Sequence, residues 1–228
     1  MVASLSTVYY GLVISHRAIP LAEVLLLAAA STAIVTLPLA SLGLWSRSKQ
    51  RAEDLSLSEL LVRDKWLSSV VLALSLGVMC GAFVVVSDKT FYDFLPVGVR
   101  DIELPGSFPG LLAAIGAGIN EEIWFRLGVL TSLTALGSWS LKIENSSTAL
   151  FWSANVVAAI LFGAAHLPQF ALMANGLSLN VIGVVLLQNG LVGLIFGWLY
   201  WRQGLLAAML AHFTADIVIH VIVPTFFV

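Results

Sequence analysis

Six runs of mostly apolar residues, each long enough to cross a lipid bilayer as a helix, constrain this chain more than any other feature. They lie at roughly 20–45, 66–87, 107–135, 149–172, 179–201 and 204–227. A spanning helix needs ~20 apolar residues. Only 11% of the residues are charged, against ~25% in a soluble domain. The sequence therefore predicts an all-α protein, a polytopic transmembrane helix bundle with about six to eight spans.

The polar connections between the runs indicate how the chain crosses the membrane. The connection at 46–65 is rich in lysine and arginine, whereas the connection at 88–106 carries mostly aspartate and glutamate. The positive-inside rule places 46–65 in the cytoplasm and 88–106 outside. The net charge of −2 gives no basic surface for nucleic acid. The single cysteine, Cys80, lies in an apolar run and is expected to be an inert core residue.

Several ionisable residues interrupt the apolar runs, where each costs ~2.5–3.5 kcal/mol at the bilayer centre. The six strongest candidates come from three different runs: Glu121, Glu122, Arg126, His166, His212 and Asp216. Such residues usually face a protein interior or a wet cavity. We therefore expect the three helices to bring them to one shared polar site.

Helical geometry sorts the first group, which lies in the stretch NEEIWFRLG. Adjacent residues leave a helix about 100° apart, so Glu121 and Glu122 point in different directions. Glu122 and Arg126 are four residues apart and share a face, which favours an ion pair. Glu121 is then left for another task. The alternative from spacing alone is that all three residues form a structural polar contact between helices.

The other two groups have similar alternatives. In FGAAH, Phe162 lies four residues before His166, so its ring can back the imidazole, although a lone histidine is often structural. His212, Asp216 and His220 form a stripe at i, i+4 and i+8. A carboxylate there can fix an imidazole tautomer, hold a proton or bind a metal, or the stripe can be a helix–helix contact. HExxH and the usual Cys/His zinc spacings are absent from the sequence, and for His220 we favour the structural interpretation.

The ordered set EEIWFR, FGAAH and HFTAD resembles the motifs of the CPBP intramembrane proteases. This family comprises the type II CAAX prenyl endopeptidases and bacteriocin-processing, abortive-infection-like enzymes. The resemblance covers roughly residues 107–220. It implies that 107–228 is the catalytic transmembrane core and that 1–106 adds N-terminal transmembrane helices and loops to the same integral domain.

The resemblance also implies roles for individual residues. Glu121 and His166 would activate a water, and His212 and Asp216 would lie beside the scissile carbonyl. The supporting residues would be Glu122, Arg126 and Phe162. Many relatives have Asn at the position of Asp216. An ionised Asp would repel an oxyanion, so Asp216 must be a neutral donor, an orienter of His212 or a water, or a metal ligand.

The predicted function is therefore hydrolysis of a peptide bond in a membrane-associated peptide or protein, by a multi-pass protein of a prokaryotic plasma membrane. Nothing in the sequence indicates a prenylated substrate. The predicted mechanism requires no cofactor; a bound zinc would use Glu121, His166, His212 and Asp216. One alternative is a non-catalytic membrane scaffold or immunity protein, which would not need this polar set. Another is a proton-coupled transporter. The sequence shows no inverted repeat, which argues against this alternative.

Overall fold

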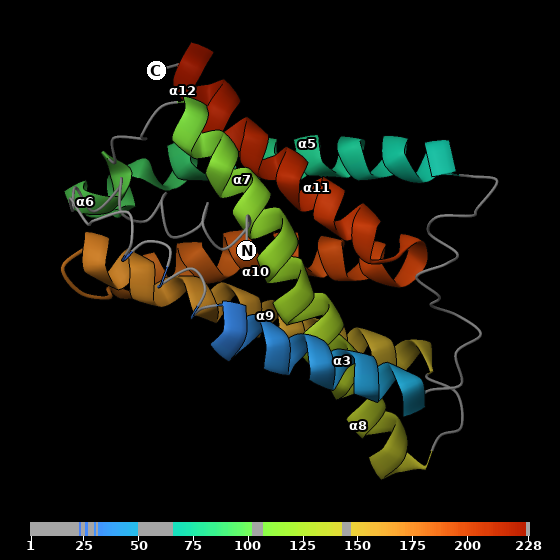
Figure 1. The fold of residues 1–228 in the computed structure, drawn as a ribbon. Coiled ribbons are helices and arrows are strands. Elements are labelled where there is room, and N and C mark those ends of the chain that lie inside the picture. The colour runs from blue at the N-terminus through green and yellow to red at the C-terminus, as the bar shows by residue number, and fades with distance from the viewer. Residues whose placement is uncertain are drawn as a thin grey trace.

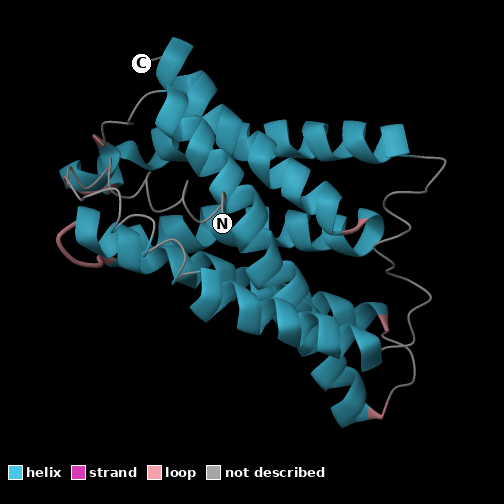
Figure 2. Ribbon diagram, viewed as in Figure 1, coloured by secondary structure: helices cyan, strands magenta, loops and turns pink. Residues whose placement is uncertain are grey.

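The computed structural model describes residues 32–49, 66–101, 107–142 and 147–226, together with the isolated positions Glu23, Leu26 and Ala30. Every regular element in these residues is helical, as Figure 2 shows, so the predicted all-α class is confirmed. The longer elements are α3 (Leu37–Lys49), α5 (Trp66–Phe91), α7 (Ser107–Glu122), α8 (Thr131–Leu141), α9 (Thr148–Met173), α10 (Leu179–Gln203) and α11 (Leu205–Ile217).

Shorter elements extend or join these helices. Three are π-helical: η1 (Thr32–Thr36), η3 (Ile123–Leu130) and η4 (Val218–Ile222). The element η3 joins α7 to α8, so that the predicted run 107–135 forms one helical path from Ser107 to Leu141. The predicted loop at 88–106 contains η2 (Tyr92–Phe94) and α6 (Val97–Arg100) in its described part, and η4 continues into α12 (Val223–Phe226).

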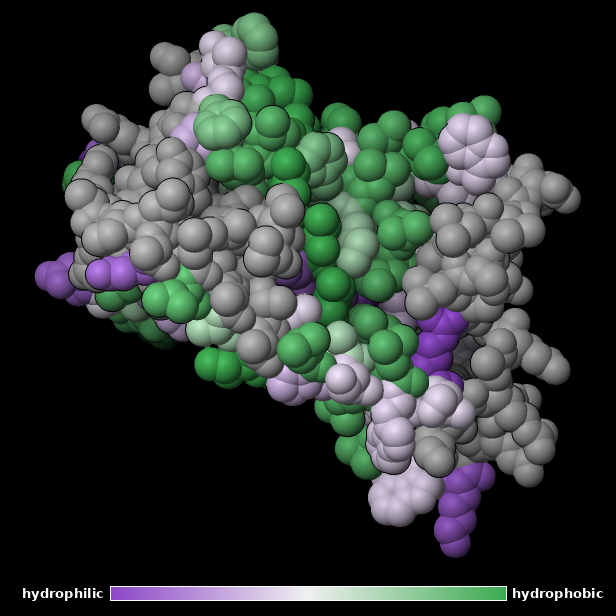
Figure 3. Space-filling view, viewed as in Figure 1, coloured by the Kyte–Doolittle hydropathy of each residue, from purple (hydrophilic) through white to green (hydrophobic). Residues whose placement is uncertain are grey.

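Four helical stretches among the described residues are long and apolar enough to cross a membrane. They are Trp66–Phe94, Thr148–Met173, Leu179–Gln203 and Leu205–Phe226. Each coincides with a predicted run, whereas the run at 20–45 lies partly outside the described residues. Exposed apolar side chains such as Val71, Val78 and Met79 cover α5, and apolar colour dominates the described surface in Figure 3. Soluble monomers rarely expose so much contiguous apolar surface, and the chain is an integral membrane protein. The predicted sidedness of its connections stays a prediction.

Helix α11 lies at the centre of the arrangement, between α5 and α7 (Figure 1). Glycines bring these helices close to it. A Cβ atom at Gly77 of α5 would lie 2.5 Å from the carbonyl oxygen of Ala211, and one at Gly118 of α7 would lie 3.0 Å from the backbone nitrogen of Phe213. Small residues permit such close approach where lipid supplies no hydrophobic driving force between helices.

Helices α9 and α10 form the other tight pair. A Cβ at Gly193 would lie 3.2 Å from Cδ1 of Phe162, and one at Gly197 would collide with the side-chain oxygen of Asn155. These two glycines therefore allow α9 and α10 to approach each other closely. Helix α3 packs on η3, where a Cβ at Gly43 would collide with the carbonyl of Leu127. The three helices that carry the predicted site residues therefore meet in the interior.

Candidate active site

Glu122 ends α7 where that helix crosses α11, and its carboxylate is shared between two partners. Oε1 lies 2.9 Å from Nδ1 of His212. Oε2 lies 3.1 Å from Nε of Arg126, and both side chains of that pair are fully buried. The ion pair expected from the i, i+4 spacing is confirmed. The contact with His212 was not foreseen, because spacing within one helix says nothing about a residue 90 positions away.

Glu121 points in another direction and meets both imidazoles. Its Oε2 atom lies 3.7 Å from Nε2 of His166 and 3.9 Å from Nε2 of His212. The Glu121 side chain is 19% exposed and that of His166 is 24% exposed, whereas that of His212 is only 7% exposed. Glu121 and His166 are therefore the more exposed side chains of the group and His212 the more buried one, while the Glu121 Oε2 atom that meets both imidazoles is itself buried.

The hydrogen bond made by His166 within α9 identifies its tautomer. Its Nδ1 atom lies 2.8 Å from the carbonyl oxygen of Phe162. A carbonyl can only accept, so Nδ1 must carry a hydrogen. In the neutral ring, Nε2 is then a bare acceptor that faces Glu121. The Phe162 ring also meets the imidazole edge-on at 4.9 Å, which is the backing contact expected from the spacing of FGAAH.

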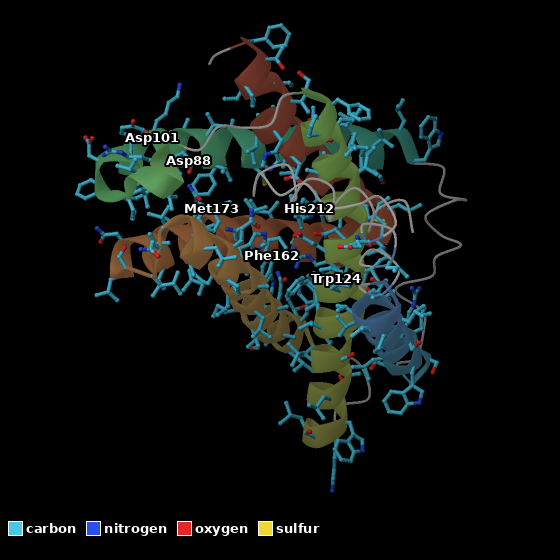
Figure 4. The ribbon with its side chains drawn as sticks, turned by 60° about the vertical axis from the view of Figure 1, so that its left-hand side comes forward. Asp88, Asp101, Trp124, Phe162, Met173 and His212 are labelled. Carbon is cyan, nitrogen blue, oxygen red and sulfur yellow. The ribbon has the colours of Figure 1, made fainter. Side chains whose placement is uncertain are left out.

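His212 is held between aromatic rings at the centre of the bundle, as Figure 4 shows for His212 and Phe162. The centroid of Phe196 lies 5.1 Å from that of the imidazole, and Phe162 approaches it edge-on at 5.9 Å. Asp216, one turn further along α11, places Oδ2 3.7 Å from Nε2 of His212. The carboxylates of Glu121, Glu122 and Asp216 therefore surround this one ring.

The Arg126 guanidinium faces the Phe162 ring, with Cζ 4.9 Å from the ring centroid. Its Nη1 and Nη2 atoms have no hydrogen-bond partner among the described residues. A cation over an aromatic face gains more when it is desolvated. Phe125 packs edge-on against the same ring at 5.1 Å. Phe125 and Phe196 were not predicted from the sequence, since an aromatic residue in an apolar run gives no signal of its position.

The structure thus brings together the six ionisable residues singled out in the sequence. His220 lies in η4, beyond this group. Within the described residues, no three His, Cys, Asp or Glu side chains are arranged to hold a metal ion. The zinc set named from the sequence stays a prediction.

Comparison with known proteins gave one family. A family model described as "Type II CAAX prenyl endopeptidase Rce1-like" matches residues 104–218, which is just over half of the chain. This range contains EEIWFR, FGAAH and HFTAD. The searches of curated proteins and of solved structures returned no match.

Proposed function

Because the chain belongs to the Rce1-like family of type II CAAX prenyl endopeptidases, we propose that it is an intramembrane endopeptidase in which Glu121 and His166 activate a water. The family indicates a protease with a peptide or protein substrate in a membrane. The proposal adds the mechanism and the residues. The location in a prokaryotic plasma membrane and the division at residue 107 stay predictions.

The observation that carries the proposal is that the Nε2 atoms of both histidines face one oxygen of Glu121, at 3.7 and 3.9 Å. Nδ1 of His166 is occupied by the Phe162 carbonyl. A water that lies beside this pair, within hydrogen-bond reach of both atoms, would therefore meet two acceptors and donate one hydrogen to each. Its lone pair would then be directed at the substrate carbonyl carbon, which is the geometry that general-base catalysis needs.

The reaction balances with these residues alone. The water oxygen forms a bond to the carbonyl carbon while Glu121 takes its proton, and a tetrahedral oxyanion results. Collapse of this intermediate breaks the C–N bond, and Glu121 returns the proton to the leaving amine. The products are a carboxylic acid and an amine, and no electrons are transferred. A partly exposed carboxylate beside an imidazole suits both proton transfers.

His212 and Asp216 suit stabilisation of the oxyanion. Nδ1 of His212 donates to Glu122, so Nε2 is the nitrogen that faces the reacting centre, 3.7 Å from Asp216. With Nε2 protonated, His212 donates to the developing negative charge, and a neutral Asp216 would supply a second donor. Removal of one such donor typically costs ~10²–10³-fold in kcat.

The test compares membranes that contain the wild-type protein with membranes that contain Glu121→Gln. Peptide termini are labelled and sequenced by mass spectrometry, so that the substrate need not be known beforehand. We expect a set of new termini that depends on Glu121, with Glu121→Gln folded and melting close to the wild type. Purified wild-type protein should then cleave the corresponding peptides in detergent, before and after treatment with a chelator.

Identical termini in both membranes would contradict the proposal and would favour a binding or transport role. Loss of cleavage on chelation, with recovery on adding zinc, would contradict the metal-free water step. His166→Ala serves as a second variant, since it removes the other acceptor for the water and should also abolish cleavage. Equal melting temperatures in the three proteins exclude loss of folding as the cause.

A further inference from the structure

We infer that Glu122 is a positioning residue, which keeps Nδ1 of His212 protonated and fixes the orientation of the ring for the reaction. The inference rests on the proposed function, because it assigns Glu122 a task in the same site. A merely structural role would have the Glu122 carboxylate neutralise Arg126 on its own helix. The contact with His212 on α11 would then be incidental.

The two oxygens of the Glu122 carboxylate meet two different partners. One oxygen meets Arg126 at 3.1 Å and the other meets Nδ1 of His212 at 2.9 Å. Arginine has no acceptor and keeps its charge in proteins. The buried carboxylate beside it is therefore an anion, which can only accept. Nδ1 of His212 must carry a hydrogen, and Nε2 is left as the nitrogen that faces Glu121 and Asp216.

Two aromatic rings set the plane of the His212 imidazole. Phe196 lies at a 31° angle to the imidazole and Phe162 meets it at 82°. These rings limit tilting of the imidazole. A flat imidazole between apolar rings can still rotate by half a turn, which exchanges the positions of its two nitrogens. The charge-assisted bond to Glu122 opposes the flip, because such bonds are shorter and stronger than neutral ones.

The stability of the folded protein does not require the ion pair between Glu122 and Arg126. Replacement of a buried ion pair by apolar or neutral groups of similar size is often neutral or stabilising. The pair is fully buried, so it carries the full cost of desolvation. The ion pair places a fixed anion at Nδ1 of His212, which a pair of apolar residues would not do.

The experiment is a cycle of Glu122→Gln, Arg126→Met and the double variant Glu122→Gln/Arg126→Met. Each single variant strands one buried charge and should lower the melting temperature in detergent. The double variant removes both charges and should regain much of that loss. We expect the kcat of the double variant to remain about a hundredfold below that of the wild type, as for loss of an orienting partner. Its KM should change much less. A double variant that melts like the wild type and retains kcat within about threefold would overturn the inference.

A second measurement does not depend on cleavage. Nitrogen-15 NMR of histidine-labelled protein reports which ring nitrogen carries hydrogen, and the His212 signals are assigned by their absence in His212→Gln. We expect Nδ1 of His212 to be protonated in the wild type and this preference to weaken in the double variant. His166 is the internal control, because its Nδ1 bonds the Phe162 carbonyl in both proteins. An unprotonated Nδ1 at His212 in the wild type would overturn the inference even if no variant of Glu122 or Arg126 folds.

The two proposals fail in different ways. Absence of cleavage by the wild type contradicts the proposed function and leaves the NMR result to decide the position of His212. Cleavage by the wild type together with an active, stable double variant contradicts only the role of Glu122.

Discussion

A methyl group at Gly118 should disturb the site without changing any residue in it. Gly118 lies on α7 one turn before Glu122. A Cβ there would stand 3.0 Å from the backbone nitrogen of Phe213, 3.1 Å from its Cβ and 3.2 Å from the carbonyl oxygen of Met209. Two of these contacts are with backbone atoms, and the third is with a Cβ fixed to the backbone. In Gly118→Ala, α7 and α11 must therefore move apart.

The size of the effect follows from these distances. Non-bonded carbon atoms lie at ~3.5–4.0 Å, and the added Cβ would lie 3.1 Å from that of Phe213, so the helices must separate by roughly 0.5 Å. The bond between Glu122 and His212 measures 2.9 Å and would lengthen to about 3.4 Å, outside the usual range of ~2.7–3.2 Å. Overpacking of a tight contact costs ~1–3 kcal/mol. With ~2–4 °C per kcal/mol for a chain of this size, Gly118→Ala should melt about 2–12 °C lower.

Activity should respond more steeply than stability. Misplacement of a group by 1 Å can cost ~10²-fold, so a shift of half that size should lower kcat by about tenfold. The assay measures kcat on a cleaved peptide and the melting temperature in the same detergent. The control is Gly183→Ala on α10, because a Cβ there meets nothing within 4 Å. If Gly118→Ala matches the wild type in both measurements, the close approach of α7 and α11 does not set the distance between Glu122 and His212.

Two further substitutions test other parts of the structure. Asp216→Asn should preserve much of the activity, because Asn always offers an N–H to the oxyanion, whereas an ionised Asp would repel it. A pH–rate profile checks this, and a loss of about a hundredfold at every pH with an unchanged melting temperature would rule out the neutral donor. Gly77→Ala should lower the melting temperature more than Gly118→Ala, because its Cβ would lie 2.5 Å from the Ala211 carbonyl oxygen. Thermal melting of the two variants side by side decides the order.

Much of the architecture could be predicted from the sequence. A single apolar run of ~20 residues can satisfy its backbone hydrogen bonds in lipid only as a helix. Four of the predicted runs have the length and composition of membrane spans. The i, i+4 spacing of Glu122 and Arg126 predicted their ion pair, because both residues lie on one continuous helical path at the junction of α7 and η3. The cost of ionisable groups in an apolar setting predicted that Glu121, His166 and His212 would be neighbours.

The tertiary structure alone decided how those neighbours meet. The sequence separated the tasks of Glu121 and Glu122. It did not predict that Glu122 would also hold His212, or that two Nε2 atoms would face one oxygen of Glu121. Phe196 lay in an apolar run without any distinguishing signal, yet it packs against the His212 ring. Spacing along a chain fixes the face of a helix on which a side chain lies. The rotation and translation of one helix against another are set by packing between residues distant in sequence, such as Gly118 against Phe213, and these decide which nitrogen meets which oxygen.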